Sequence, residues 1–127
     1  AMTLRSPLAA ARGLGSAKSG THHWWAQRVT AIALVPLTVW FVIGLIAHAG
    51  ASYAEARAWI GSPISATLMI CLIVAMFHHA QLGLQVVIED YIHAERCKIA
   101  SLMLVKGAAF FLGVLGVLSV VRIAFGG

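Results

Sequence analysis

Three long apolar runs constrain this chain more than any other feature of its sequence. They lie at about residues 29–48, 64–88 and 99–121. Each run reaches the roughly 20 residues that a helix rising ~1.5 Å per residue needs to cross a hydrocarbon layer ~30 Å thick. A membrane β-barrel would instead need about eight or more short segments of alternating polarity. The runs therefore predict an all-α membrane protein with three transmembrane helices.

Charged residues are too few for a soluble domain. They make up 10% of the chain, and 61% of its residues are hydrophobic, whereas soluble domains usually carry about 25% charged residues. Three helices of this length also enclose little interior. We therefore expect them to pack against a partner membrane subunit as well as lipid.

The chain divides into an arm and a membrane domain. Residues 1–20 carry Arg and Lys but no acidic residue and contain several Gly and Ser, so we expect a flexible cytoplasmic arm. Residues 21–127 form the predicted three-helix transmembrane domain. The connection between its first two spans has room for a short surface helix that ends near Trp59. The three spans are expected at about residues 26–48, 64–88 and 99–124.

The net charge of +5 indicates orientation in a membrane rather than nucleic-acid binding, because no basic run is interleaved with aromatic residues. Only basic charges precede the first span, and Arg96 and Lys98 follow the second. The loop between these spans has Arg57 balanced by Glu55. The positive-inside rule then places the N-terminus and the second loop in the cytoplasm.

A histidine, a carboxylate and a phenol share the second span. His79 lies between mid-membrane and the inner leaflet, where a neutral imidazole can ligate haem iron or hydrogen-bond a neighbouring helix. Asp90 follows eleven residues later, so both side chains lie on one helix face, ~16 Å apart along the axis. Tyr91 begins the adjacent face. The spacing fits a redox cofactor below a polar surface site, and it fits equally a packed histidine below a solvated carboxylate.

His78 leaves the helix about 100° away from His79. Two adjacent residues of one helix cannot bind opposite faces of one iron. His78 is therefore more typical of a packing or hydrogen-bonding residue. Bis-histidine haem ligation would need a histidine from another helix, in this chain or in a partner.

A cation and a histidine precede the first span. Arg28 is the strong cation at the start of the predicted helix, and His22 lies six residues before it. A guanidinium suits the carboxylate of a haem propionate. A snorkelling anchor that fixes topology explains the same residues equally well.

The pattern His79, ten residues, Asp90, Tyr91 resembles the H-x10-D-Y signature of the hydrophobic membrane anchor subunits, the D subunits, of succinate dehydrogenase (respiratory complex II). The segment "GTHHWWAQRVTAIAL" resembles the N-terminal motif of the same family. In "FHHAQ" a second histidine adjoins the expected ligand, and the ten-residue spacing selects His79.

The resemblance implies a role for each motif residue. His79 would be one axial ligand of a b-type haem that is shared with a partner anchor subunit, which supplies the other ligand. Arg28 and His22 would contact the haem propionates. Tyr91 would donate a hydrogen bond to a ubiquinone carbonyl, and Asp90 would organise that site and its proton supply.

The resemblance also implies the assembly. The partners would be a second cytochrome b anchor subunit, an iron-sulfur subunit and a flavoprotein subunit, with FAD and the iron-sulfur clusters only in the latter two. The complex would act as a succinate:ubiquinone oxidoreductase in a bacterial cytoplasmic (inner) membrane, with this chain as a multi-pass, non-autonomous subunit.

Other functions remain compatible with the sequence. The anchor of a fumarate reductase is a close variant that would use a quinone of lower potential. A small proton-conducting or transporter subunit would use His79, Asp90 and Tyr91 as a relay. A purely structural assembly protein would need none of these three side chains.

Overall fold

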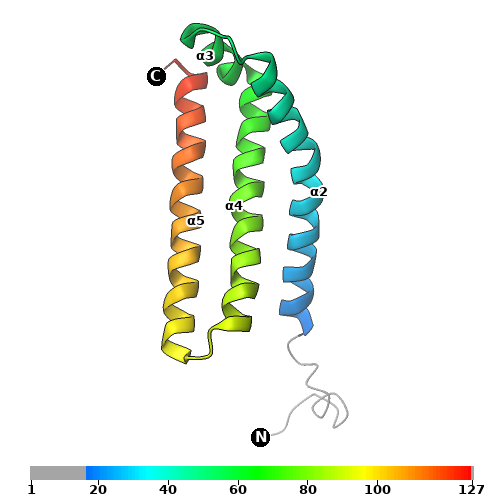
Figure 1. Cartoon of the computed structure of the whole chain (residues 1–127), viewed down its shortest axis with the longest axis vertical. Coiled ribbons are helices and arrows are strands. Elements are labelled where there is room, and N and C mark those ends of the chain that lie inside the picture. The colour runs from blue at the N-terminus through cyan, green and yellow to red at the C-terminus, as the bar shows by residue number, and fades with distance from the viewer. Residues whose placement is uncertain (1–16, 127) are drawn as a thin grey trace, which may run out of the picture.

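The computed structural model describes residues 17–126 and contains only helices in that range. The predicted arm lies mostly in residues 1–16, outside the described residues, and residues 17–20 already belong to the first helix. In Figure 1 the long helices run alongside one another, and a short helix at one end connects the first of them to the second. The helices are α2 (Ala17–Ala47), α3 (Tyr53–Gly61), α4 (Pro63–Tyr91) and α5 (Glu95–Ala124).

The three long helices have the length and apolar composition of membrane spans. The candidate spans are Thr21–Ala47, Pro63–Tyr91 and Glu95–Ala124, of 27, 29 and 30 residues. At ~1.5 Å per residue, the three helices are ~40–45 Å long and extend beyond a ~30 Å hydrocarbon layer. The predicted all-α fold with three transmembrane helices is confirmed. The start of α2 and the α4–α5 connection lie at the same end of the molecule (Figure 1), and the cytoplasmic location of that end stays a prediction.

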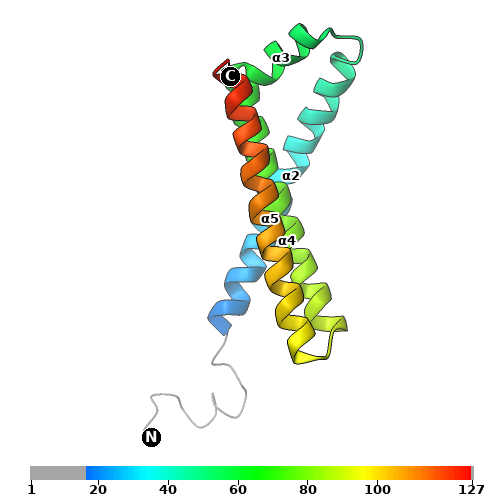
Figure 2. The same cartoon turned by 90° about the vertical axis from the view of Figure 1, so that its left-hand side faces the viewer.

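Helix α4 occupies the middle of the molecule. It packs against both α2 and α5, whereas α2 and α5 share no close backbone contact within residues 17–126. Figure 2 shows α2 crossing the α4–α5 pair obliquely, with its two ends apart from that pair. The helices therefore form a row rather than a closed bundle.

The core is correspondingly small. Its buried members come from α4 and α5, and α2 contributes only half-buried side chains such as Leu37 and Trp40 around them. Most of the apolar surface of α2 and α5 is exposed. This surface can contact lipid or other membrane subunits. The buried cluster consists of Ala66, Met69, Leu72 and Val120.

Helix α3 closes the end of the molecule opposite the α4–α5 connection. Ser52 and Glu55 form a reciprocal capping box at its start, which satisfies two backbone donors that the helix leaves free. The Trp59 ring covers Gly44 of α2 so closely that a Cβ at Gly44 would overlap it. Trp59 also stacks on His48, with ring centroids 4.4 Å apart. The predicted surface helix ending near Trp59 is confirmed.

Candidate functional site at the contact of α2 and α4

His79 lies at the contact between α4 and α2. Its Nδ1 atom is 3.0 Å from the Thr30 hydroxyl oxygen. That hydroxyl also donates to the Ala26 carbonyl oxygen, 2.7 Å away and one turn earlier in α2. Among the described residues, the Thr30–His79 pair is the one side-chain hydrogen bond that joins two membrane-spanning helices.

Polar side chains of α2 line the same contact. His23, Gln27 and Thr30 are spaced by four and three residues, so they share one face of the helix. The Gln27 amide nitrogen lies 3.9 Å from the position that a Cβ on Gly83 would occupy. His23 Nε2 and Gln27 Oε1 are buried and have no hydrogen-bond partner within the described part of the chain. Buried polar atoms normally have a partner in a folded protein.

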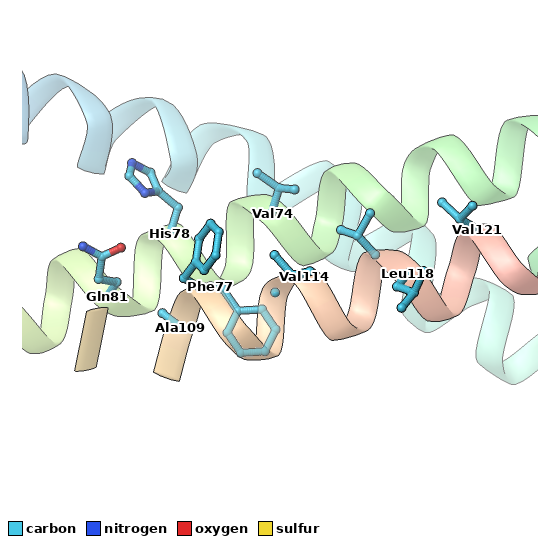
Figure 3. A pocket seen from close by; sticks show the side chains of 11 residues that line it. Val74, Phe77, His78, Gln81, Ala109, Val114, Leu118 and Val121 are labelled. Carbon is cyan, nitrogen blue, oxygen red and sulfur yellow. The ribbon is translucent and has the colours of Figure 1, made fainter. Parts of the chain in front are cut away.

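His78 has different neighbours from His79. It lines a groove of about 560 Å³ between α4 and α5, together with Gln81. Figure 3 shows these two side chains at one end of the groove, with Val121 at the other. The two histidines therefore face different neighbours, as their helical spacing predicts. The other lining residues are apolar or glycine: Val74, Phe77, Ala109, Phe110, Gly113, Val114, Val117 and Leu118.

Asp90 and Tyr91 are the last two residues of α4 and are exposed. The Tyr91 side chain is 78% exposed, and its hydroxyl has no hydrogen bond within residues 17–126. Because α4 is one continuous helix, Tyr91 lies ~18 Å along the axis from His79. The structure thus separates the predicted haem ligand from the predicted quinone residues and holds both on a single rigid element.

Arg28 and His22 are both exposed on α2. The Arg28 guanidinium lies over the Trp24 ring, 5.2 Å from its centroid. Six residues at ~100° each separate the two side chains by ~120° around the helix. The structure does not bring Arg28 and His22 together, and it shows no contact between Arg28 and His79 within the described residues.

Four further residues were given no role by the sequence analysis. His23 and Gln27 belong to the polar face of α2, and Thr30 bonds to His79. The four-and-three spacing of these polar residues inside an apolar span is the signal that could have found them. Lys106 lies inside the third span and is exposed, and nothing in the described residues explains it.

The described residues hold no cluster of three or more side chains suited to a metal ion. One histidine, however, is all that a chain contributes when it supplies a single axial ligand to haem iron, because the porphyrin provides the equatorial ligands. The contact between α2 and α4 could supply one such histidine ligand, since the Nε2 atom of His79 has no hydrogen bond within residues 17–126 and is available as a ligand.

Comparisons with known proteins agree on one family. A family model described as succinate dehydrogenase/fumarate reductase transmembrane subunit matches residues 2–116. The succinate dehydrogenase hydrophobic membrane anchor subunit of Rickettsia bellii is 35% identical over 102 residues, which cover 80% of this chain and 82% of the relative. The protein of the same description from Paracoccus denitrificans is 37% identical over 86 residues, or 68% of this chain and 67% of the relative. No solved structure matches the chain.

Proposed function

Because the chain belongs to the family of succinate dehydrogenase/fumarate reductase transmembrane subunits, we propose that it holds one side of a b-type haem and forms part of a quinone-reduction site. The chain is a multi-pass membrane protein and a membrane anchor subunit of succinate dehydrogenase by family. The observation that carries the proposal is the position of His79, with one ring nitrogen bonded to Thr30 and the other free of hydrogen bonds within the described residues.

The haem site is proposed to lie beside the α2–α4 contact. His79 Nε2 would be its iron ligand, and we propose that a second anchor subunit covers the haem at the open row of helices and supplies the other ligand. When bound, the haem takes up and releases one electron. Arg28 is exposed on α2, so its guanidinium is available to a propionate outside this chain, where a charge-assisted bond is favourable. His22 is proposed to contact a propionate separately from Arg28, because its side chain leaves α2 in another direction.

The quinone site is proposed at the end of α4. The Tyr91 phenol is exposed and can donate a hydrogen bond to a ubiquinone carbonyl, which stabilises negative charge as it develops on that oxygen. Asp90 precedes it on the helix end and is proposed to organise the site and to hold a proton for the reduced quinone. We propose that this helix end lies at the membrane surface, where a quinone can meet an electron donor.

The remaining subunits complete the electron path. A flavoprotein subunit with FAD and an iron-sulfur subunit would bind at the end of the molecule that carries Tyr91, and the assembly would sit in a bacterial inner membrane. Electrons from succinate would then reach ubiquinone beside Tyr91. The chain itself supplies orientation and electrostatics, and the cofactors carry the redox chemistry.

The test is a dithionite-reduced minus oxidised absorbance spectrum of the complex purified in mild detergent, with its subunits identified by mass. We expect a b-type haem signal and three companions of flavoprotein, iron-sulfur and second-anchor type. A proton-conducting subunit would show no haem and would carry protons across liposome membranes. Proton transport by a protein that has no haem and no companion subunits would contradict the proposal.

A further inference from the structure

We propose that Thr30 is a positioning residue for haem: its hydroxyl accepts the Nδ1 hydrogen of His79 and so fixes the ring with an unprotonated Nε2 available to iron. This inference rests on the proposed function, because it adds to His79 a partner that sets the strength of the iron bond. It joins Thr30 of α2 to His79 of α4 through the 3.0 Å contact between Oγ1 and Nδ1.

The position of the hydroxyl hydrogen follows from the oxygen distances. Thr30 Oγ1 lies 2.7 Å from the Ala26 carbonyl oxygen and 3.1 Å from that of Gln27. Two oxygens ~2.7 Å apart have a hydrogen between them, and a carbonyl brings none. The single hydroxyl hydrogen is therefore directed at Ala26. Thr30 Oγ1 can then only accept a hydrogen from His79.

The ring state of His79 follows in turn. Its Nδ1 carries the hydrogen and donates it to Thr30. A neutral imidazole has one N–H, so Nε2 keeps its lone pair. That is the form in which imidazole binds a metal. The bond also fixes the rotation of the ring, because Thr30 is itself held against the backbone of α2.

The acceptor on Nδ1 changes the ligand electronically as well. A histidine whose second nitrogen donates to a fixed oxygen is a more basic ligand, and the bond from Thr30 to Ala26 strengthens this acceptor through cooperativity. A more basic ligand favours ferric over ferrous iron. Thr30 should therefore lower the haem reduction potential and slow haem loss.

Bonding of a hydroxyl to the carbonyl four residues earlier is common in membrane helices, and the chain offers a matched control. Thr67 bonds Pro63 in the same way at 2.7 Å but is exposed and has no partner on another helix within the described residues. A valine at either position removes the hydroxyl and keeps the shape. Only the change at Thr30 should affect the haem.

The experiment compares Thr30→Val, Thr30→Ser, Thr67→Val and His79→Ala in the complete complex. Flavin content and succinate oxidation with a water-soluble dye measure assembly. Haem per flavin, the rate of haem transfer to apomyoglobin, and the midpoint potential titrated in isolated membranes measure the ligand. We expect Thr30→Val to raise the potential and to speed haem loss about tenfold or more. Thr30→Ser and Thr67→Val should match the unaltered complex.

The outcomes separate the two proposals. If His79→Ala keeps a normal haem, the ligand assignment itself is wrong. If His79→Ala loses or alters haem while Thr30→Val matches Thr67→Val in potential and haem loss, only the role of Thr30 is wrong. Thr30→Ala is a second variant and should change the haem as Thr30→Val does. The midpoint potential is titrated in isolated membranes, so this measurement does not require a complex that survives extraction.

Discussion

At the scale of single residues, adjacent side chains on α4 differ in what they contact. His79 bonds to Thr30 across the α2–α4 contact, whereas His78 lines the groove shared with α5. A histidine that binds a metal almost always has a hydrogen-bond partner on its second nitrogen, and of these two adjacent histidines only His79 has such a partner within the described residues. The contacts therefore favour the same histidine that the ten-residue spacing to Asp90 selects.

The two histidines provide a matched pair of variants. We expect His79→Ala to remove or alter the proposed b-type haem of the complex, because the proposed iron ligand is lost, and His78→Ala to leave the haem spectrum unchanged. The reduced-minus-oxidised spectrum, normalised to flavin, measures both. Loss of haem in His78→Ala with a normal spectrum in His79→Ala would show that the register of the motif is shifted by one residue.

Tyr91 offers a second prediction at this scale. Tyr91→Phe would remove the hydrogen bond that we propose to the reacting quinone, and a bond to a developing charge contributes ~1.5–3 kcal/mol. Succinate:quinone reductase activity should therefore fall roughly 10- to 100-fold, while electron transfer from succinate to a water-soluble dye stays normal. Tyr53 is the other tyrosine of the chain, lies on α3, and serves as the control. Equal quinone activity in Tyr91→Phe and Tyr53→Phe would count against the quinone assignment.

The sequence predicts candidate residues better than it predicts their contacts. His79, Asp90 and Tyr91 could be found because they lie on one helix, where spacing alone fixes their relative direction. Thr30 could not be paired with His79 in that way, since 49 residues separate them in the chain. Their contact depends on the rotation of two helices about their own axes, which is a tertiary property.

At the scale of elements, α3 is held in place by close approach to α2. Trp59 covers Gly44, where a side chain would overlap the indole ring, and it stacks on His48, whose Nδ1 lies 2.8 Å from the Gly44 carbonyl oxygen. A glycine within the membrane span α2 thus admits an aromatic ring from the surface helix. Close contact of this kind is a main source of stability in membrane proteins, where burial of apolar surface between helices contributes little.

Gly44→Ala should therefore destabilise the complex. Moving the Trp59 ring to admit a methyl group costs ~1–3 kcal/mol. Alanine is more favourable than glycine in a helix by only ~1 kcal/mol, so the cost of the overlap should outweigh this gain. The thermal unfolding temperature of the purified complex is the measurement. The change should be harmless in a Trp59→Ala background, where the overlap is gone. An equal loss in both backgrounds would mean that the clash is not the cause.

At the scale of the whole molecule, the three helices form a row, and this arrangement was not predictable from the sequence. An apolar stripe along one face would have shown which side of each helix meets its neighbours, but these helices are apolar on most faces. The number of spans could be predicted, because length and hydropathy suffice. The choice of α4 as the central helix could not, because it depends on local packing such as the approach of Ile73 to Gly116.

Helix α2 is the least secured of the three, and this leads to a prediction for the whole molecule. It has no buried residue in its most apolar segment and no close backbone contact with α5 in the described residues. It is held against α4 by partly buried apolar side chains and by the Thr30–His79 bond. Such bonds contribute only ~0.6 kcal/mol on average between membrane helices. In lipid, the isolated chain should therefore have a mobile α2, which the proposed second anchor subunit should fix.

Distances between spin labels can measure this difference. One label on Cys71 of α4 is paired with Thr38→Cys on α2 or with Ser119→Cys on α5, all at exposed positions, in a chain carrying Cys97→Ser. In nanodiscs, the α2–α4 distance distribution should be broad for the isolated chain and narrow in the complete complex. The α4–α5 distribution should be narrow in both, since glycines let these helices approach closely. An α2–α4 distribution that is equally narrow without partners would mean that this chain alone positions α2, and that the second anchor subunit is not needed to fix His79 against Thr30.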